Sequence, residues 1–504
     1  MSRAHKMVGG ALVAAACMAT TGASGDPPLI DKPALCATQP QGPGGLPLTL
    51  AQWSEGARLF KGLGDFHRAI STNSPEAQAY FDQGMRFLWA FNHDEAARSF
   101  AKAAELDPQC AMCYGGISLT VGPNYNLPMM AQPRATVAWE ALQQAAKHAT
   151  ATTPVEQALI AALATRYQGP EPLDPSNEAP VLTAYAQAIK GVADRFPDDG
   201  DVRTLTAEAM MNINAWKLRS LDGVPAPGTE EIVAILEAVL AKDQRHPGAT
   251  QYYIHAVEAS PNPGKGVPAA QRLPGMMPAA GHLEHMPAHI MQRVGRYEDA
   301  AEANRKGVSA DLVYFAMTKP LDYYVMYNTH NYQSLAFSAA MEGRRAETIE
   351  AARQSRALVS DDMLLTTPGT DWYVAELYVA MVRFGMWDEI LAEPVPNPKL
   401  TGLTGAYRYA KATALAAKGR IDDAKAELME LEKVAAIDGD AGLNRVKDVL
   451  AVALLNAKAR IAMAENKDEE AIGLLREAVA KEDRLAYSEP ADSFFPTLIF
   501  SDRP

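Results

Sequence analysis

Three closely spaced histidines are the residues of this sequence with the clearest capacity for chemistry. His282, His285 and His289 lie within eight residues, although the whole chain of 504 residues has ten histidines. An α-helix turns by about 100° per residue, so the three side chains would share a face about 60° wide. Neutral imidazoles grouped in this way are typical transition-metal ligands, whereas protonated imidazoles this close would repel one another. The spacing predicts a metal site unlike the H-E-x-x-H zinc proteases, because Glu284 directly precedes the second histidine. Pro287 would loosen the shared face if it kinked the helix.

Histidines in the two neighbouring helical segments extend this predicted site. His255 precedes Glu258 by about one helical turn, so the two side chains share a face. His330 occupies the corresponding place in the next segment. Because packed helices lie about 10 Å apart, the imidazoles of three adjacent helices would meet in one volume. We expect His255 and the trio to bind one ion, with His330 or Glu258 completing or flanking the shell. Glu258 is also the candidate general base. The tyrosines expected to line the approach are Tyr252, Tyr253, Tyr324 and Tyr327.

The type of metal follows from the ligand chemistry. Imidazole-rich sites suit copper, zinc, iron and nickel, and copper heads the affinity order of the divalent ions. Methionines close to the trio would add soft ligands for Cu(I), although a methionine cluster among helices equally fits a hydrophobic core. These methionines are Met276, Met277, Met286 and Met291. We expect a transition metal, with copper favoured over iron or zinc.

An internal repeat supplies the helices that must position these residues. The segment from 77 to 108 has small and aromatic residues at the spacing of a tetratricopeptide repeat, a unit of about 34 residues that forms two antiparallel helices. Small residues let the helices approach closely, aromatic residues fill the gap between them, and a proline ends the second helix. The residues that carry this pattern are Tyr80, Gly84, Phe87, Ala96, Phe100, Ala103 and Pro108.

Related helix corners later in the chain predict a repeat array. Each helix pair leaves an apolar face unburied on its own, so neighbouring pairs must stack. We expect an all-α fold, a tetratricopeptide-like solenoid of helical hairpins that forms a right-handed superhelix over 65–488. Residues 26–64 are expected to form a Pro/Gly-rich leader, and 489–504 a C-terminal tail. The corners are marked by Gly295, Gly343, Gly385 and Gly419.

Composition and charge exclude several classes of protein. With 48% hydrophobic and 21% charged residues, the chain is an ordinary folded protein. Its net charge of −13 argues against nucleic-acid binding, because phosphate backbones are bound through basic surfaces. Residues 1–25 have the basic start, short apolar stretch and small-residue cleavage site of an export signal. No later segment has the length and apolarity of a transmembrane helix. We expect an exported protein, periplasmic or secreted, with lipid anchoring through Cys17 as an alternative.

Three cysteines remain after the predicted signal, and an oxidising compartment favours disulfides between such residues. Cys110 and Cys113 form a C-x-x-C motif, and Tyr114 stands where covalent c-type haem attachment requires histidine. A local disulfide at the start of a helix is the expected role, with thiol redox chemistry or metal binding as alternatives. Cys36 has no assigned partner.

Several of these segments together resemble a group of secreted bacterial tetratricopeptide-repeat proteins with a His-rich H-x-x-H-M-P-A-H segment. The matching stretches are Phe91–Ala96, Asp107–Cys113, His282–Ala300 and Leu485–Pro490. The resemblance implies a shared site, without naming a substrate, around His255, His282, His285 and His289.

Two classes of function fit these observations. The first is a metal-dependent oxidoreductase that acts on a small organic or peptide substrate in the concave groove of the superhelix. The alternative is an envelope scaffold for protein–protein interactions, or a metal-binding carrier without catalysis. An open coordination position on the metal would separate them. The sequence has no Ser-His-Asp elbow, phosphate loop or dinucleotide fingerprint, so hydrolase, kinase and dinucleotide chemistry have no support.

Overall fold

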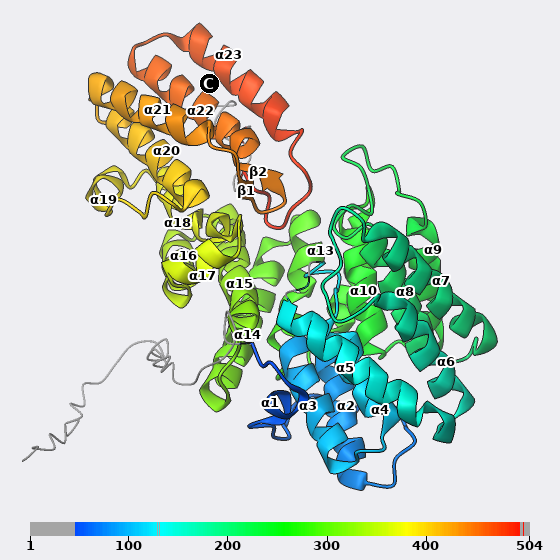
Figure 1. Cartoon of the computed structure of the whole chain (residues 1–504). Helices are drawn as coiled ribbons and strands as arrows, with labels where there is room; N and C mark the ends of the chain where they lie inside the picture. The colour runs from blue at the N-terminus through cyan, green and yellow to red at the C-terminus, as the bar shows by residue number, and fades with distance from the viewer. Residues whose placement is uncertain (1–45, 129, 131, 494–496, 498–504) are drawn as a thin grey trace, which may run out of the picture. The chain divides into compact units, whose positions relative to one another are not determined.

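We describe the fold from a computed structural model. Polar residues cap the two helices of its first helical hairpin. The helix α2 (Pro75–Trp89) begins after Ser74, whose side chain accepts a hydrogen bond from a backbone N–H of the first turn. The helix α3 (His93–Leu106) begins after Asn92, which caps it in the same way. The two helices pack against each other as the predicted antiparallel pair (Figure 1).

The close approach of α2, α3 and α4 (Ala111–Val121) depends on two glycines. A Cβ atom at Gly84 would lie 2.5 Å from the ring of Phe100, and one at Gly116 would lie 2.6 Å from it. The fully buried Phe100 ring is therefore clamped between two helices that have no side chain at the contact. This packing confirms the tetratricopeptide-like interpretation of the Gly84 and Phe100 pattern.

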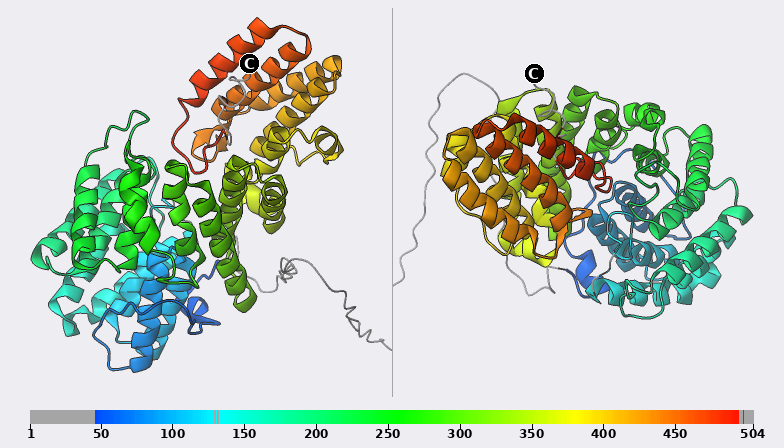
Figure 2. Two further views of the ribbon diagram at one scale, coloured as in Figure 1. Left: turned by 180° about the vertical axis from the view of Figure 1, so that it is seen from behind. Right: turned by 90° about the horizontal axis from the view of Figure 1, so that it is seen from above.

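Successive helices continue the pattern of antiparallel pairs, so the fold is the predicted all-α solenoid of helical hairpins. The structure describes residues 46–128, 130, 132–493 and 497, all within one compact unit of the chain. Figure 2 shows the pairs α20/α21 and α22/α23 stacked side by side, in agreement with their contacts. The other helices are α1 (Leu50–Ser54), α5 (Gln132–His148), α6 (Pro154–Leu163), α7 (Ala179–Arg195), α8 (Gly200–Ile213), α9 (Thr229–Lys242), α10 (Pro247–Glu258), α11 (Val267–Arg272), α12 (Gly281–His285), α13 (Pro287–Arg293), α14 (Tyr297–Met317), α15 (Asp322–Met341), α16 (Arg345–Leu358), α17 (Asp361–Thr366), α18 (Glu376–Arg383), α19 (Trp387–Ala392), α20 (Thr401–Ala417), α21 (Ile421–Ala435), α22 (Val446–Ala464) and α23 (Asp468–Glu482).

Little other regular structure interrupts the helices. Two short antiparallel strands, β1 (Asp440–Ala441) and β2 (Asn444–Arg445), join α21 to α22. Short 3₁₀ helices occupy Ala149–Ala151, Ala164–Arg166, Pro263–Gly266 and Thr370–Val374.

Two large hydrophobic cores meet at α14 and α15. The first core extends from Trp53 to Tyr327, and the second from Ala301 to Ala457. The inner helices α10, α12, α13 and α15, which carry the predicted metal ligands, lie at or beside this junction. The candidate site is therefore held by the packing of both cores.

Part of the predicted leader belongs to the fold. Within 26–64, the helix α1 packs on α3, and both Trp53 and Leu63 are buried. Their large apolar side chains provide the burial that a Pro/Gly-rich composition obscures. The start of the predicted tail at 489 also packs into the fold, because Glu489 and Asp492 are buried.

Among the residues that the structure describes, no helix is long and apolar enough to cross a membrane. The predicted export signal, Cys17 and Cys36 lie outside the described residues.

Candidate metal centre

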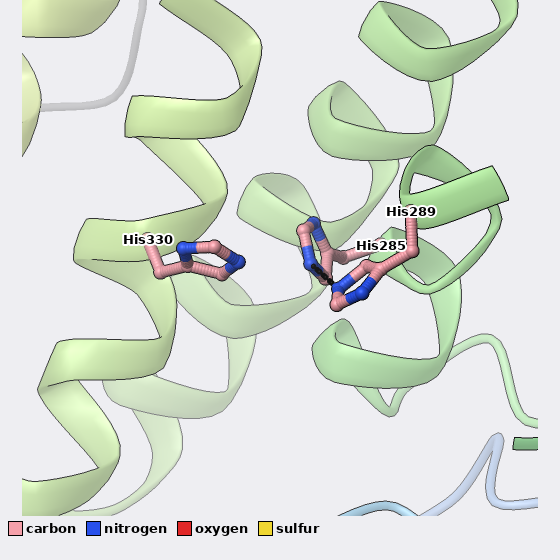
Figure 3. A group of neighbouring side chains, drawn as sticks. All are labelled: His285, His289 and His330. Carbon is pink, nitrogen blue, oxygen red and sulfur yellow. Dashed lines mark hydrogen bonds between the residues drawn. The ribbon is translucent and has the colours of Figure 1, made fainter. Parts of the chain in front are cut away.

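His285, His289 and His330 form the first group of ligand atoms. One ring nitrogen from each residue lies within 4.8 Å of those from the other two. His285 ends α12 and His289 lies in α13, while His330 reaches the same place from α15 (Figure 3). His285 Nε2 and His289 Nε2 are 2.8 Å apart. Three imidazoles that converge in this way suit a transition metal ion.

Asn304 on α14 fixes the protonation of His285. The Asn304 Nδ2 donates a hydrogen bond to the carbonyl oxygen of Ala300 at 2.9 Å, so its Oδ1 faces His285 Nδ1 at 2.5 Å. His285 Nδ1 must therefore carry the proton, which leaves a lone pair on Nε2. This nitrogen is the one that points towards His289, as a metal ligand would require.

His255, Glu258, His289 and Glu489 form the second group of ligand atoms, also within 4.8 Å of one another. Glu258 Oε1 lies 2.8 Å from His255 Nδ1, and Glu258 Oε2 lies 2.6 Å from His289 Nδ1. Glu489 Oε1 lies 2.7 Å from the same His289 nitrogen. The four side chains are at most 7% exposed. Both groups contain His289, but they face different nitrogens of its ring.

The C-terminal segment after α23 delivers Glu489 to this site. Asn444, the first residue of β2, accepts a hydrogen bond from the Ala486 N–H at 2.8 Å and donates one to Asp492 at 2.7 Å. Trp372 Nε1 donates to the Asp492 carbonyl oxygen at 3.0 Å. Between these anchors, the Tyr487 hydroxyl donates to Glu489 Oε2 at 3.0 Å, which orients the carboxylate.

His282 lies beside both groups but belongs to neither among the described residues. Its ring stacks on Phe91 at a centroid distance of 5.2 Å and lies 5.8 Å from the ring of His285. Both of its ring nitrogens are buried without a hydrogen-bond partner in the described part of the chain. Its predicted role as a ligand remains a prediction.

The electrostatic environment separates His289 from the other histidines. Burial lowers the pKa of His255 to about 3 and that of His330 to about 4, and it lowers the pKa values of His282 and His285 well below the ordinary value. These imidazoles are therefore neutral, which is the form that binds metals. Burial also acts to lower the pKa of His289, but Glu489 and Glu258 outweigh it and raise this pKa to about 10. Burial and the charge of Glu258 raise the pKa of Glu489 to about 7.

The predicted ligands are core residues, which corrects the expectation of an open groove. His255, His282, His285 and His289 are all at most 3% exposed. Tyr125 and Trp216, which come from loops, pack on His255 at centroid distances of 5.3 and 5.7 Å. These loops and the C-terminal segment fill the space in front of the inner helices. The tyrosines expected to line an approach are buried as well: Tyr252, Tyr253, Tyr324 and Tyr327.

Two residues of the site are absent from the sequence-based prediction. Asn304 lies on the outer helix of its pair, and no spacing rule connects it to the histidines. Glu489 lies 200 residues from His289 in a segment without helical periodicity. The only signal for Glu489 is that Leu485–Pro490 takes part in the family resemblance.

The two cysteines of the C-x-x-C motif lie at the start of α4, as predicted. Their Sγ atoms are 2.02 Å apart, the separation of a bonded pair, and both residues are buried. The oxidation of this pair in the isolated protein remains a prediction.

Comparisons with known proteins show likeness in fold. No protein-family model and no curated protein matches the sequence. Similar solved structures include the human IFIT1 dimer with PPP-AAAA, with a TM-score of 0.36 and 12% identity over 76% of this chain and 79% of that chain. Yeast Tom70 has a TM-score of 0.31 and 11% identity over 84% of this chain and 95% of that chain. Any statement about function must therefore come from the site itself.

Proposed function

We propose that this protein is a helical-repeat scaffold that holds a transition metal ion between His285, His289 and His330. In this proposal the ion occupies the space towards which the three imidazoles converge. Copper is the favoured ion, ahead of iron or zinc, because imidazole ligands suit it and it heads the affinity order. His285 and His330 are already neutral, and His289 becomes a ligand by losing its Nε2 proton when the ion binds.

The arrangement of Asn304 and His285 is the observation that carries this proposal. A metal-binding histidine usually donates its other ring N–H to a fixed acceptor, and the Asn304 amide oxygen is such an acceptor for His285. The free Nε2 of His285 faces His289 Nε2 at 2.8 Å, where the N–H of a protonated His289 donates to it. In this proposal a cation takes the place of that proton and is bound by both nitrogens.

Burial favours holding the metal over catalysis at it. Two clefts of about 550 and 700 Å³ lie elsewhere in the described residues, and none of the predicted ligands lines either. A substrate would therefore need the site to open. We accordingly place a scaffold or carrier role ahead of the metal-dependent oxidoreductase, in which Glu258 would act as general base. Stacked helical hairpins also suit the binding of a protein partner.

Metal analysis of one double variant tests the proposal. His285→Ala with His330→Ala removes two of the three imidazoles and leaves the second group of ligand atoms intact. We expect the variant to lose this ion after dialysis against a weak chelator, while its helical circular dichroism is retained. His67→Ala is the matched control, because its side chain is 57% exposed and lies outside the site. Unchanged metal content in a folded double variant would refute the proposal.

A further inference from the structure

The two nitrogens of His289 face two different sets of ligands. His289 Nε2 lies 2.8 Å from His285 Nε2, in the group completed by His330. His289 Nδ1 lies 2.6 Å from Glu258 Oε2 and 2.7 Å from Glu489 Oε1. Because these nitrogens lie on opposite sides of the ring, both groups can use the same imidazole without competing for one atom.

We propose that the centre holds two metal ions and that the imidazole of His289 bridges them. The inference rests on the proposed function for its first ion, between His285, His289 and His330. It adds a second ion, bound by His255, Glu258, His289 Nδ1 and Glu489.

The second set of ligands has the composition of a complete site. It offers two imidazoles and two carboxylates, enough for a four-coordinate transition metal ion. When both carboxylates are ionised, the single positive charge of a protonated His289 balances only one of them, whereas a divalent cation balances both. This donor set is harder than the three imidazoles of the first site, and it suits zinc, iron or manganese better than Cu(I).

With a single ion at the first site, the second set of ligands is held together by protons alone. In that case Glu258 and Glu489 would serve only to orient His289, yet one N–H has one proton to share between two carboxylate oxygens within 2.7 Å. One carboxylate is sufficient to orient a ligand histidine. Moreover, His255 Nδ1 points at Glu258 as well, and no described residue offers a hydrogen bond to its buried Nε2.

Binding of both ions requires an imidazolate. Each new metal–nitrogen bond displaces the proton held by that nitrogen of His289, and both protons leave to solvent. No electron is transferred. The bridge places the two ions at a fixed separation on either side of one ring, with Glu489 supplied by the C-terminal segment.

Metal stoichiometry tests the inference separately from the proposed function. The full-length protein is stripped with a chelator, dialysed against Zn²⁺ alone and analysed for zinc. We expect two ions per chain in the unaltered protein. We expect one ion in Glu258→Gln with Glu489→Gln, which keeps the first site. We also expect one ion in His285→Ala with His330→Ala, which keeps the second site.

A buried carboxyl group outside the centre provides the matched control. Glu376 is fully buried and neither of its oxygens has a hydrogen-bond partner among the described residues, so Glu376→Gln makes the same change from carboxyl to amide at a buried position elsewhere. This variant should retain two zinc ions. One ion in the unaltered protein, lost in the histidine double variant, would overturn the second site and leave the proposed function standing. No bound zinc in the unaltered protein would overturn both.

A measurement on the unaltered protein tests the bridge itself. Two Cu²⁺ ions joined by an imidazolate couple magnetically, so protein loaded fully with Cu²⁺ should give an electron paramagnetic resonance signal well below its copper content. The glutamate double variant should instead show the spectrum of isolated Cu²⁺ that accounts for all its copper. A spectrum of isolated ions at full intensity in the unaltered protein would overturn the bridge.

Discussion

His285 and His289 place their Nε2 atoms 2.8 Å apart across a break between two helices. Pro287 begins α13 directly after Met286, yet Met286 keeps helical dihedral angles of φ −49° and ψ −33°. The proline occupies the first turn of a helix, where its missing N–H leaves no hydrogen bond unmade. The break therefore leaves the helical spacing of the two imidazoles intact. The kink expected at Pro287 does not separate them.

Asn304 should control metal affinity without contacting the metal. Asn304→Ala removes the acceptor that fixes the His285 tautomer, and we expect metal affinity to fall about 10–100-fold. Asn304→Asp retains an acceptor oxygen and should keep affinity near that of the unaltered protein. Competition with a chelator of known affinity measures both variants. Equal affinities in the alanine and aspartate variants would mean that the tautomer of His285 has no role in binding.

The sequence predicts those residues of the centre whose positions follow from helical spacing and from the repeat. His285 and His289 share a helical face, and the repeat frame places His255 and His330 on neighbouring inner helices, so all four are brought together as expected. Asn304 and Glu489 could not be found in this way, because each reaches the site through tertiary packing. The burial of the site could not be predicted for the same reason, because Tyr125 and Trp216 lie in loops, whose sequences have no hydrophobic periodicity.

Glycine substitutions should have opposite effects at two helical positions. In a helix, replacing glycine by alanine ordinarily stabilises by about 0.5–1 kcal/mol. A Cβ atom added at Gly473 in α23 would meet no neighbouring atom within 4 Å, so Gly473→Ala should show that gain. At Gly84 the new Cβ would meet the Phe100 ring at 2.5 Å, so Gly84→Ala should destabilise by about 1–3 kcal/mol. Urea unfolding measures both, and a gain in stability at Gly84 would contradict the clamped packing of Phe100.

The cysteine pair at the start of α4 should be oxidised in the isolated protein. Cys110 and Cys113 are buried and close enough to bond. We expect neither to react with an alkylating reagent when the protein is unfolded without reductant, and both to react after reduction. Mass spectrometry of the peptide that contains both residues distinguishes these states. Alkylation of both cysteines before reduction would show free thiols and reject the disulfide.

Asp311 should make the stability of the protein depend on pH. Its carboxyl group is buried in α14 and accepts hydrogen bonds from the Tyr324 hydroxyl and the Asn331 side-chain amide, each at 2.9 Å. Burial raises the pKa of Asp311 to about 7, against about 3.9 in an unfolded chain. The folded state therefore holds the proton more tightly than the unfolded state. The contribution of Asp311 to the free energy of unfolding is fully present below about pH 4. It decreases by about 4 kcal/mol in total as the pH rises to about 7.

The variant Asp311→Asn should remove this dependence. The amide oxygen of the new side chain at position 311 can still accept a hydrogen bond from the Tyr324 hydroxyl. The Asn331 Oδ1 has no hydrogen-bond partner in the described part of the chain, and a rotation of the Asn331 amide by 180° lets it accept from the new side chain. Urea unfolding of metal-free protein at about pH 4.5 and about pH 7.5 gives the free energies of unfolding for both chains. We expect the stability of the variant relative to the unaltered protein to increase by about 3 kcal/mol between these two pH values. A difference between the two chains that stays constant with pH would mean that Asp311 is ionised in the folded protein throughout this range.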